Sequence, residues 1–281
     1  MVLVTGATGT VGREVVAQLV AEGHEVRAFT RDRTTARLDP RVEVVAGDLD
    51  EPETVARAVE GVDRVFSLAV GPKGAVQEGN LARAARRAGA RLVVKLSSLG
   101  VGDRPLNAIT GWHEAGERAI RDSGLSFTFL RPGSFMSNAL FWAGTIKAQG
   151  RVFSSFGEGH YPPVHPRDIA AVAVKALTGS GHEGETYRLT GPVALSVADQ
   201  VRILAQVVGR PIAFVAISDE AARQGMVEAG MAGPLVEALV QVGIFIRSGR
   251  ASEVLPTVRE VTGRDPLTFE QWARENAAAF R

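Results

Sequence analysis

The 281-residue sequence contains no cysteine. This absence excludes disulfides, thiolate nucleophiles, cysteine-bound metals and redox-active C-x-x-C pairs. No apolar run approaches the roughly 20 residues that a membrane-spanning helix needs. The formal net charge of +1 gives no general attraction to nucleic acid, and the arginines between residues 83 and 91 are interpreted as a solvated helix face. The composition, with 45% apolar residues, is that of a soluble globular protein with no nucleic-acid or membrane partner.

Three catalytic signatures are also missing. The segment "HEAGE" at residues 113–117 holds only the first half of H-E-x-x-H, and the five histidines show no metal-binding spacing, so no metal site is expected. G-x-S-x-G does not occur, which removes the nucleophile elbow of the serine hydrolases. The segment "GATGTVGR" lacks the G-K-[ST] of a P-loop, so a nucleotidase of that class is not expected.

A glycine-rich turn stands near the start of the sequence. "VTGATGTVG", residues 4–12, lies between an apolar strand-like run and an apolar pattern at helical spacing, and a second strand candidate follows. In a strand–turn–helix unit the first amides and the positive dipole end of the helix point at the turn, where a pyrophosphate can bind. The glycines Gly6, Gly9 and Gly12 therefore predict dinucleotide binding, in preference to a turn that serves only packing.

Strand-like runs alternate with helical patterns through the first half of the chain. The runs lie at 1–4, 25–29, 42–45, 63–69, 91–96 and 126–130, and the helical patterns at 11–22, 52–60, 76–88 and 111–122. Strict alternation of this kind predicts an α/β fold, a Rossmann-like, doubly wound parallel sheet with helices on both faces.

The alternation weakens after residue 134. Ser196 and Asp199 are spaced as in a helix capping box. The candidate elements of this part are a helix at 168–177, strands at 185–189 and 211–215, and three later helical stretches, the last from Thr268.

The pattern indicates two domains. A dinucleotide-binding domain is expected to comprise 1–134 together with 163–190. A smaller α/β lobe, 135–162 and 191–281, is expected to cover the cofactor and to shape the substrate pocket.

Ligands on doubly wound sheets bind beyond the carboxyl ends of the strands, so the residues that follow each run are candidate cofactor contacts. Asp48 either meets the adenine amino group or caps the helix that begins near Pro52. The full set of these candidates is Gly6, Thr8, Gly9, Thr10, Val11, Gly12, Asp48, Leu49, Ala69, Val70 and Ser97.

Residues 30–33, "TRDR", bear on the choice between NAD and NADP. Units that bind NAD carry a carboxylate at the end of the second strand for the ribose 2′-OH, whereas NADP brings a phosphate to that place. Thr30 occupies this position, and Arg31 and Arg33 can grip a phosphate. The segment favours NADPH over NADH, while Asp32 leaves NAD open.

Seven segments together resemble one family. They are "VTGATGTVG", "GHEVRAFTRD", "GDLD", "VVKLSSLG", "FTFLRPGSFMSN", "VHPRDIAAVA" and "GETYRLTGP". The first is the T-G-x-x-G-x-x-G turn typical of short-chain dehydrogenases/reductases, and the set is similar to their atypical NmrA-like branch over residues 1 to roughly 281. The resemblance implies NAD(P) binding with either NADPH-dependent quinone reduction or a regulatory role as a redox sensor.

Ordinary members of that superfamily use a Tyr-x-x-x-Lys pair, in which the tyrosine acts as acid or base. The chain has two tyrosines, Tyr161 and Tyr187, and neither is followed by lysine four residues later. At the expected place the alignment sets Ile109 in the tyrosine position and His113 in the lysine position. The resemblance implies this loss, because NmrA-like proteins commonly lack the tyrosine.

His113 is the first candidate catalytic residue. Glu117 lies four residues on, on the same helical face, where it can hold the imidazole and raise its pKa. His113 then either lines the nicotinamide pocket, orienting the cofactor or donating a proton, or is a histidine near the surface that Glu117 satisfies. Ser97 and Ser98 are candidates to bond substrate or ribose, and Lys95, on the same side of its strand as Ser97, is assigned a structural role.

The segment "RPGSFMSN" passes beside the nicotinamide in the resembled family. The resemblance makes Pro132 and Gly133 backbone contacts of the cofactor, and it places Phe135 and Asn138 in the wall of the substrate pocket. Tyr161 is a third catalytic candidate, as a proton donor, against the alternative of a packing role.

These observations predict an NADPH-dependent oxidoreductase that transfers hydride to a small, mostly apolar acceptor such as a quinone or a related conjugated or aromatic carbonyl compound. The alternatives are a non-catalytic sensor acting through a protein partner, and an isomerase or epimerase that uses the dinucleotide without net turnover. The glycine turn begins too early to leave room for a signal peptide, so a cytoplasmic location is expected. A homo-oligomer is left open.

Overall fold

The computed structural model describes residues 1–34 and 36–281. Its packing divides the chain into two compact units. Unit 1 comprises Met1–Pro132, Pro166–Leu189 and Glu260–Gly263, and unit 2 comprises Gly133–His165, Thr190–Arg259 and Arg264–Arg281. The boundaries fall near those of the two predicted domains, whose separate roles stay predictions.

Unit 1 is built on a parallel sheet. Its strands are β1 (Val2–Thr5), β2 (Val26–Thr30), β3 (Glu43–Ala46), β4 (Arg64–Ser67), β5 (Leu92–Leu96), β6 (Ser126–Pro132) and β8 (Thr186–Leu189). They lie in the order β3-β2-β1-β4-β5-β6-β8, and every neighbouring pair is parallel. The strand order changes direction at β1, so the crevice for a ligand is expected beyond the carboxyl ends of β1 and β4.

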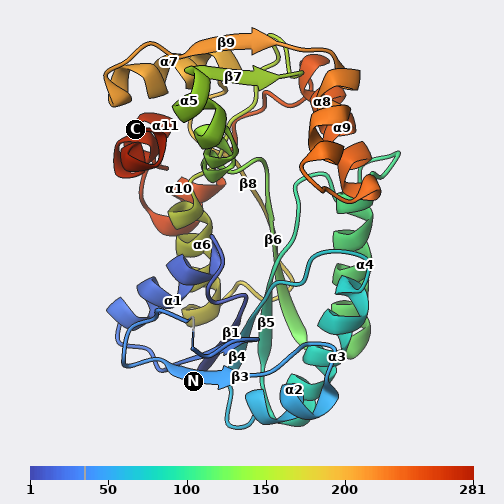
Figure 1. Cartoon of the computed structure of the whole chain (residues 1–281). Coiled ribbons are helices and arrows are strands. Elements are labelled where there is room, and N and C mark those ends of the chain that lie inside the picture. The colour runs from blue at the N-terminus through green and yellow to red at the C-terminus, as the bar shows by residue number, and fades with distance from the viewer. Residues whose placement is uncertain (35) are drawn as a thin grey trace. The chain divides into compact units, whose positions relative to one another are not determined.

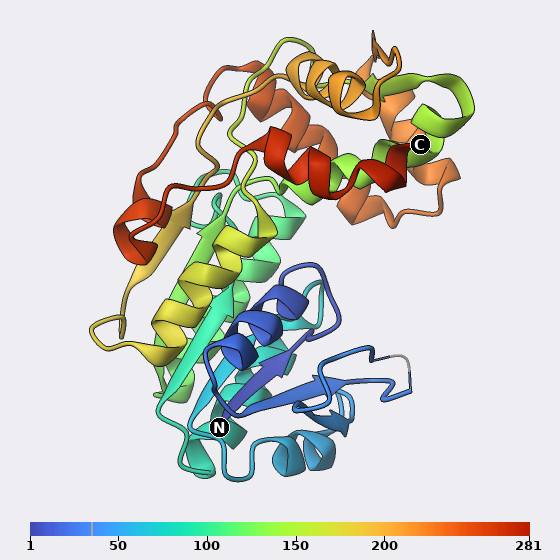
Figure 2. The same ribbon diagram turned by 90° about the vertical axis from the view of Figure 1, so that its left-hand side faces the viewer.

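Helices cover both faces of this sheet. One face carries α1 and α6 and the other carries α2, α3 and α4, as Figures 1 and 2 show. Their bounds are α1 (Gly12–Ala21), α2 (Pro52–Ala58), α3 (Gly74–Arg87), α4 (Ala108–Ser123) and α6 (Pro166–Thr178). The predicted fold class, a Rossmann-like doubly wound α/β sheet, is confirmed.

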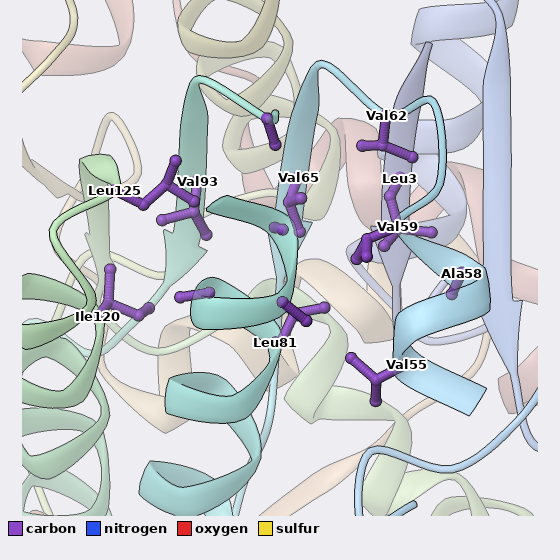
Figure 3. Packing of buried hydrophobic residues seen from close by; sticks show 14 of the residues in the cluster. Leu3, Val55, Ala58, Val59, Val62, Val65, Leu81, Val93, Ile120 and Leu125 are labelled. Carbon is purple, nitrogen blue, oxygen red and sulfur yellow. The ribbon is translucent and has the colours of Figure 1, made fainter. Parts of the chain in front are cut away.

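Buried aliphatic side chains join the sheet to the helices on the α2–α4 face. Leu3, Val65 and Val93 from three adjacent strands meet Leu81 of α3 and Ile120 of α4 (Figure 3). Each fully buried side chain of this size contributes about 1.5–3 kcal/mol relative to an exposed one. Because both faces of the sheet are covered, its central strands read as nearly unbroken apolar runs, such as the "LVVKL" of β5.

Unit 2 contains a second, two-stranded parallel sheet of β7 (Arg151–Ser154) and β9 (Ala213–Ala216). Its core includes Tyr161, Leu204 and Trp272. The helical elements are η1 (Met136–Trp142), α5 (Ala143–Gln149), α7 (Val197–Val208), α8 (Asp219–Glu228), α9 (Gly233–Arg247), α11 (Phe269–Glu275) and η2 (Ala277–Phe280), and α10 (Thr257–Thr262) lies at the boundary with unit 1.

The sequence interpretation of this region was partly wrong. The capping box is confirmed, because the Ser196 hydroxyl accepts from the Asp199 N–H while the Asp199 carboxylate accepts from the Ser196 N–H. Three helical stretches were expected after β9, but the described residues there hold four α-helices and η2. The reason is a weak signal, since α8 buries none of its residues and α10 has only six.

Among the helices of residues 1–34 and 36–281, none combines the length and the apolar character that spanning a bilayer requires.

Candidate active site

The turn between β1 and α1 has a separate steric need for each of its glycines. Gly6 has φ of +62°, a conformation that L side chains rarely adopt. A Cβ added to Gly12 would lie 2.1 Å from the carbonyl oxygen of Gly6, so the helix can approach the turn only without a side chain there. The Gly9 N–H donates to the same carbonyl at 2.9 Å and closes the turn, and a Cβ added to Gly9 would crowd that oxygen at 3.2 Å. These contacts account for the G-x-x-G-x-x-G spacing.

The backbone of this turn is open to an anionic ligand. In the part of the chain that the structure describes, no side chain caps α1, whose N-cap residue is Val11. Thr8, Gly9 and Thr10 are exposed. Arg13 folds back over the turn and donates to the carbonyl oxygens of Thr8 at 2.9 Å and Gly9 at 3.3 Å, which places a positive charge beside it. The diphosphate of a dinucleotide fits this arrangement of uncapped amides, helix dipole and guanidinium.

The loop after β2 carries the residues that bear on the 2′-phosphate. Arg31 and Arg33 are both exposed. Oδ1 of Asp32 accepts hydrogen bonds from the backbone N–H and the hydroxyl of Thr34, at 2.8 and 2.7 Å. The Asp32 carboxylate therefore stabilises its own loop, while two exposed guanidinium groups flank it.

The predicted cofactor contacts after β3 and β4 differ in their burial and in their hydrogen bonds. Asp48 accepts the backbone N–H two residues on at 2.9 Å, so it closes a turn ahead of α2. Leu49 packs, partly buried, against the core. Ala69 is buried, and its N–H donates to Glu78 of α3 at 3.3 Å, whereas Val70 is exposed. Their part in cofactor binding stays a prediction.

A buried lysine lies at the end of β5. Lys95 is fully buried, and its Nζ donates to Oε1 of Glu78 at 2.7 Å. Nζ also lies 3.4 Å from the carbonyl oxygen of Leu96 and 3.4 Å from Nδ1 of His113 on α4. Burial raises the pKa of Glu78, and the charge and hydrogen bond of Lys95 oppose this shift. As the period-two pattern predicted, Lys95 and Ser97 lie on the same side of the sheet, since both bond residues of α4.

The second carboxylate oxygen of Glu78, Oε2, lies against a glycine. Among the described residues, Oε2 of Glu78 is buried without a hydrogen-bond partner. A Cβ added to Gly116 of α4 would lie 2.0 Å from this oxygen. Gly116 therefore makes the room in which α3 can place its carboxylate beside Lys95.

A second buried carboxylate, that of Glu117, lies one turn beyond His113 on α4. Oε1 of Glu117 accepts the Ser97 hydroxyl at 2.7 Å and Nε of Arg131 at 2.8 Å. Oε2 accepts Nη2 of Arg131 at 2.7 Å and Nη2 of Arg121 at 3.2 Å. Burial acts to raise the pKa of Glu117, but hydrogen bonds from Arg131 and Ser97 and the charge of Arg121 outweigh it, so this pKa lies below its usual value.

The expectation of a raised pKa for His113 is wrong, although Glu117 does act in that direction. Burial and the positive charge of Lys95 lower the pKa of His113 to about 3, and the attraction of Glu117 does not offset them. The imidazole is therefore uncharged at neutral pH. The alternative of a histidine near the surface bonded to Glu117 does not fit either, because His113 is only 7% exposed and its ring bonds Lys95.

Tyr161 has the surroundings of a packing residue. It lies in the core of unit 2, where its ring meets Phe156 edge to face at a centroid distance of 6.0 Å. Burial raises the pKa of its hydroxyl to about 12, and a hydrogen bond with Gln200 opposes this shift only in part. A proton donor with this pKa is poorly matched to neutral pH.

The remaining predicted residues follow β5 and β6. Ser98 is partly buried, and its carbonyl accepts the Val101 N–H at 3.1 Å. The carbonyl of Pro132, the last residue of β6, accepts the Leu99 N–H at 2.9 Å. In unit 2, Gly133 and Phe135 are partly buried and Asn138 is exposed. The structure thus brings Ser97, Lys95, His113 and Glu117 together in unit 1, and the roles of the others stay predictions.

The reversal of strand order at β1, the glycine turn and the uncapped helix define a dinucleotide-binding α/β protein. A family model described as NAD(P)H-binding matches residues 6–180. The chain belongs to this NAD(P)H-binding family, and it is an NAD(P)H-dependent oxidoreductase. The resemblance inferred from the sequence motifs is confirmed.

Three known proteins are similar over the full length of the chain. The (4-alkanoyl-5-oxo-2,5-dihydrofuran-3-yl)methyl phosphate reductase of Streptomyces griseus is 43% identical, over 100% of this chain and 99% of that protein. The NAD(P)H azoreductase of Xenophilus azovorans is 40% identical with the same coverage. The solved structure of the Citrobacter sp. triphenylmethane reductase complexed with NADP(H) is 26% identical, covers 99% of this chain and 100% of its own, and superposes with a TM-score of 0.82.

Proposed function

We propose that this protein is an NADPH-dependent reductase that delivers hydride to a small conjugated electrophile, such as a quinone or a related aromatic or unsaturated carbonyl compound. The bound nicotinamide would supply the hydride. The glycine turn with Arg13 would hold the diphosphate, and the exposed Arg31 and Arg33 would hold the 2′-phosphate.

The observation that carries this proposal is that the pKa values of the candidate acids lie far from neutral pH. The pKa of His113 is about 3 and that of Tyr161 about 12, so neither group changes charge near neutral pH. The hydroxyl proton of Ser97 is donated to Glu117. An efficient general acid has a pKa near the working pH, and this set contains none.

A site without such an acid suits an acceptor that is already electrophilic. A quinone or an unsaturated carbonyl accepts hydride without prior protonation, and its oxygen can take a proton from water afterwards. The names of the relatives agree with this class, since a 4-alkanoyl-5-oxo-2,5-dihydrofuran and an azo compound are both conjugated acceptors. The argument favours a conjugated acceptor over an ordinary ketone or alcohol.

The test is a screen of NADPH oxidation by the purified protein, followed through the cofactor absorbance. The panel contains quinones, unsaturated lactones, azo dyes and simple ketones. We expect turnover with the conjugated acceptors and little with the ketones. Tight binding of NADPH with no turnover on any acceptor would contradict the proposal and favour the sensor alternative.

Arg31→Ala is expected to weaken NADPH binding by about 10- to 100-fold, the range for losing a hydrogen bond to a charged group. NADH binding should change little, because NADH lacks the 2′-phosphate. Titration calorimetry with both cofactors measures the two affinities. Arg83→Ala is a matched control on the exposed face of α3 and should change neither. Equal losses for NADPH and NADH in Arg31→Ala would refute the 2′-phosphate assignment.

A further inference from the structure

The buried pair of Lys95 and Glu78 fixes the hydrogen-bonding state of the His113 ring. A protonated lysine has three N–H donors and no acceptor. Nζ of Lys95 lies 2.7 Å from Oε1 of Glu78. It also lies 3.4 Å from the carbonyl oxygen of Leu96 and 3.4 Å from Nδ1 of His113. All three must accept, so Nδ1 of His113 carries a lone pair and the single ring proton resides on Nε2.

Three charged side chains near the His113 ring come from three different elements, β5, α3 and α4. Lys95 from β5 touches it, Glu78 from α3 lies behind Lys95, and Glu117 lies one turn along α4 with its oxygens bonded to Ser97 and Arg131. In the described chain, the hydrogen-bond partner of the ring is Lys95, at Nδ1. Nε2 is therefore available to donate a hydrogen bond to a ligand at the carboxyl end of β5, where ligands of such sheets bind.

We propose that Lys95 and Glu78 are positioning residues that hold His113 as the neutral Nε2–H tautomer, so that Nε2 donates a hydrogen bond to the substrate oxygen that gains negative charge during reduction. This inference rests on the proposed reductase function. It makes His113 a hydrogen-bond donor that keeps its proton, rather than an acid that gives it up.

The step balances without a change of charge on the histidine. Hydride brings two electrons to the electrophilic carbon of the acceptor, the π electrons move to its oxygen, and the cofactor is left oxidised. The Nε2–H hydrogen bond stabilises that oxygen, and water supplies the proton that completes the reduced product. Removing a donor that is aimed at developing negative charge lowers the rate by about 100-fold.

The tautomer is measurable without cofactor or substrate. Long-range proton–nitrogen correlation spectra of the full chain, labelled with 15N in histidine, distinguish protonated from unprotonated ring nitrogens. A comparison with His113→Gln assigns the signal among the five histidines. We expect Nε2 protonated, Nδ1 unprotonated and no titration of the ring between about pH 5 and 8. A ring with the proton on Nδ1, a mixture of tautomers, or a titration in that range would overturn the proposal.

The double variant Glu78→Gln/Lys95→Met tests the cause. It removes the charged pair together, which avoids an unpaired buried charge. We expect the His113 ring to lose its single tautomer and its pKa to rise. The exposed pair of Lys73 and Asp50, in contact at 2.9 Å, offers the matched control Asp50→Asn/Lys73→Met, which should leave the ring signals unchanged. An unchanged tautomer in the Glu78→Gln/Lys95→Met variant would overturn the role of the pair.

Kinetics separate this inference from the proposed function. With an acceptor found in the screen, His113→Ala should lower kcat by about 100-fold and leave the Kd of NADPH unchanged, and Glu78→Gln/Lys95→Met should lower kcat by about 10-fold. A weaker Kd with unchanged kcat would overturn the assignment of Nε2 to the substrate oxygen. Failure of every acceptor would defeat the reductase proposal, and with it the donor role of Nε2, while the spectra would still report whether Lys95 and Glu78 set the tautomer.

Discussion

Gly12→Ala is expected to weaken NADPH and NADH binding alike, by about 10- to 100-fold, the range for losing a hydrogen bond to a charged group such as the diphosphate. The added Cβ would lie 2.1 Å from the carbonyl oxygen of Gly6 and 2.7 Å from its carbonyl carbon. Both atoms belong to the backbone, so no rotamer change relieves the clash. The turn and the first residues of α1 must separate, which moves the amides that face the diphosphate.

The same substitution should lower the free energy of unfolding by about 1–3 kcal/mol, the usual effect of overpacking. Calorimetric titration with both cofactors and urea unfolding followed by circular dichroism measure the two effects. Gly225→Ala in α8 is the control, since a Cβ there meets nothing within 4 Å and alanine favours a helix. If Gly12→Ala bound both cofactors as the wild type does, the turn would not be the diphosphate site.

The glycine turn was predictable because its cause is local. Gly6, Gly9 and Gly12 act through the backbone of the nine-residue segment that contains them. The spacing of apolar residues predicts the strand before this segment and the helix after it. The sheet was predictable for the same reason, since its central strands β1, β4 and β5 are apolar runs with helical patterns between them. The largest shift is at α4, predicted from residue 111 and observed from Ala108, where Asn107 caps the helix with Thr110.

The charged network was not predictable in this way because it joins residues that are distant in sequence. Lys95 within the apolar run of β5 was noticed, but its partner Glu78 was missed. A signal did exist: Glu78 shares the helix face of the buried Leu81, Ala82 and Ala85, where a carboxylate needs a counter-charge. The error over the pKa of His113 has the same origin, because the (i, i+4) spacing suggests Glu117 as partner, while the fold supplies Arg131 to Glu117 and Lys95 to His113.

Glu117→Gln is expected to lower the free energy of unfolding by about 3–5 kcal/mol at neutral pH, the cost of removing one partner of a buried ion pair. Glu117 has no exposed side-chain surface, and it joins its own helix α4 to Ser97, the residue after β5, and to Arg131 of β6. Glutamine keeps one acceptor, but it turns an amide N–H₂ toward the Arg131 guanidinium and leaves that charge uncompensated. Urea unfolding of both proteins at pH 7 measures the loss.

The pH dependence of this loss gives a second, independent check. The pKa of Glu117 lies below its ordinary value of 4.5, so the folded protein loses this proton at a lower pH than the unfolded chain does. The stabilisation is complete above that ordinary value and disappears as the pH falls through the folded pKa, so wild type and Glu117→Gln should converge in stability under acid.

Glu237→Gln provides the matched control for the effect of burial. Glu237 also receives two hydrogen bonds from one arginine, Arg223, at 2.7 and 3.2 Å, but its side chain is 54% exposed. Water and salt screen such a pair, so its loss should be far smaller than that of Glu117→Gln and should diminish further in high salt. Equal losses in the two variants would mean that the Glu117 pair behaves as an ordinary surface ion pair, and that the enclosure of β5, α4 and β6 around it contributes nothing.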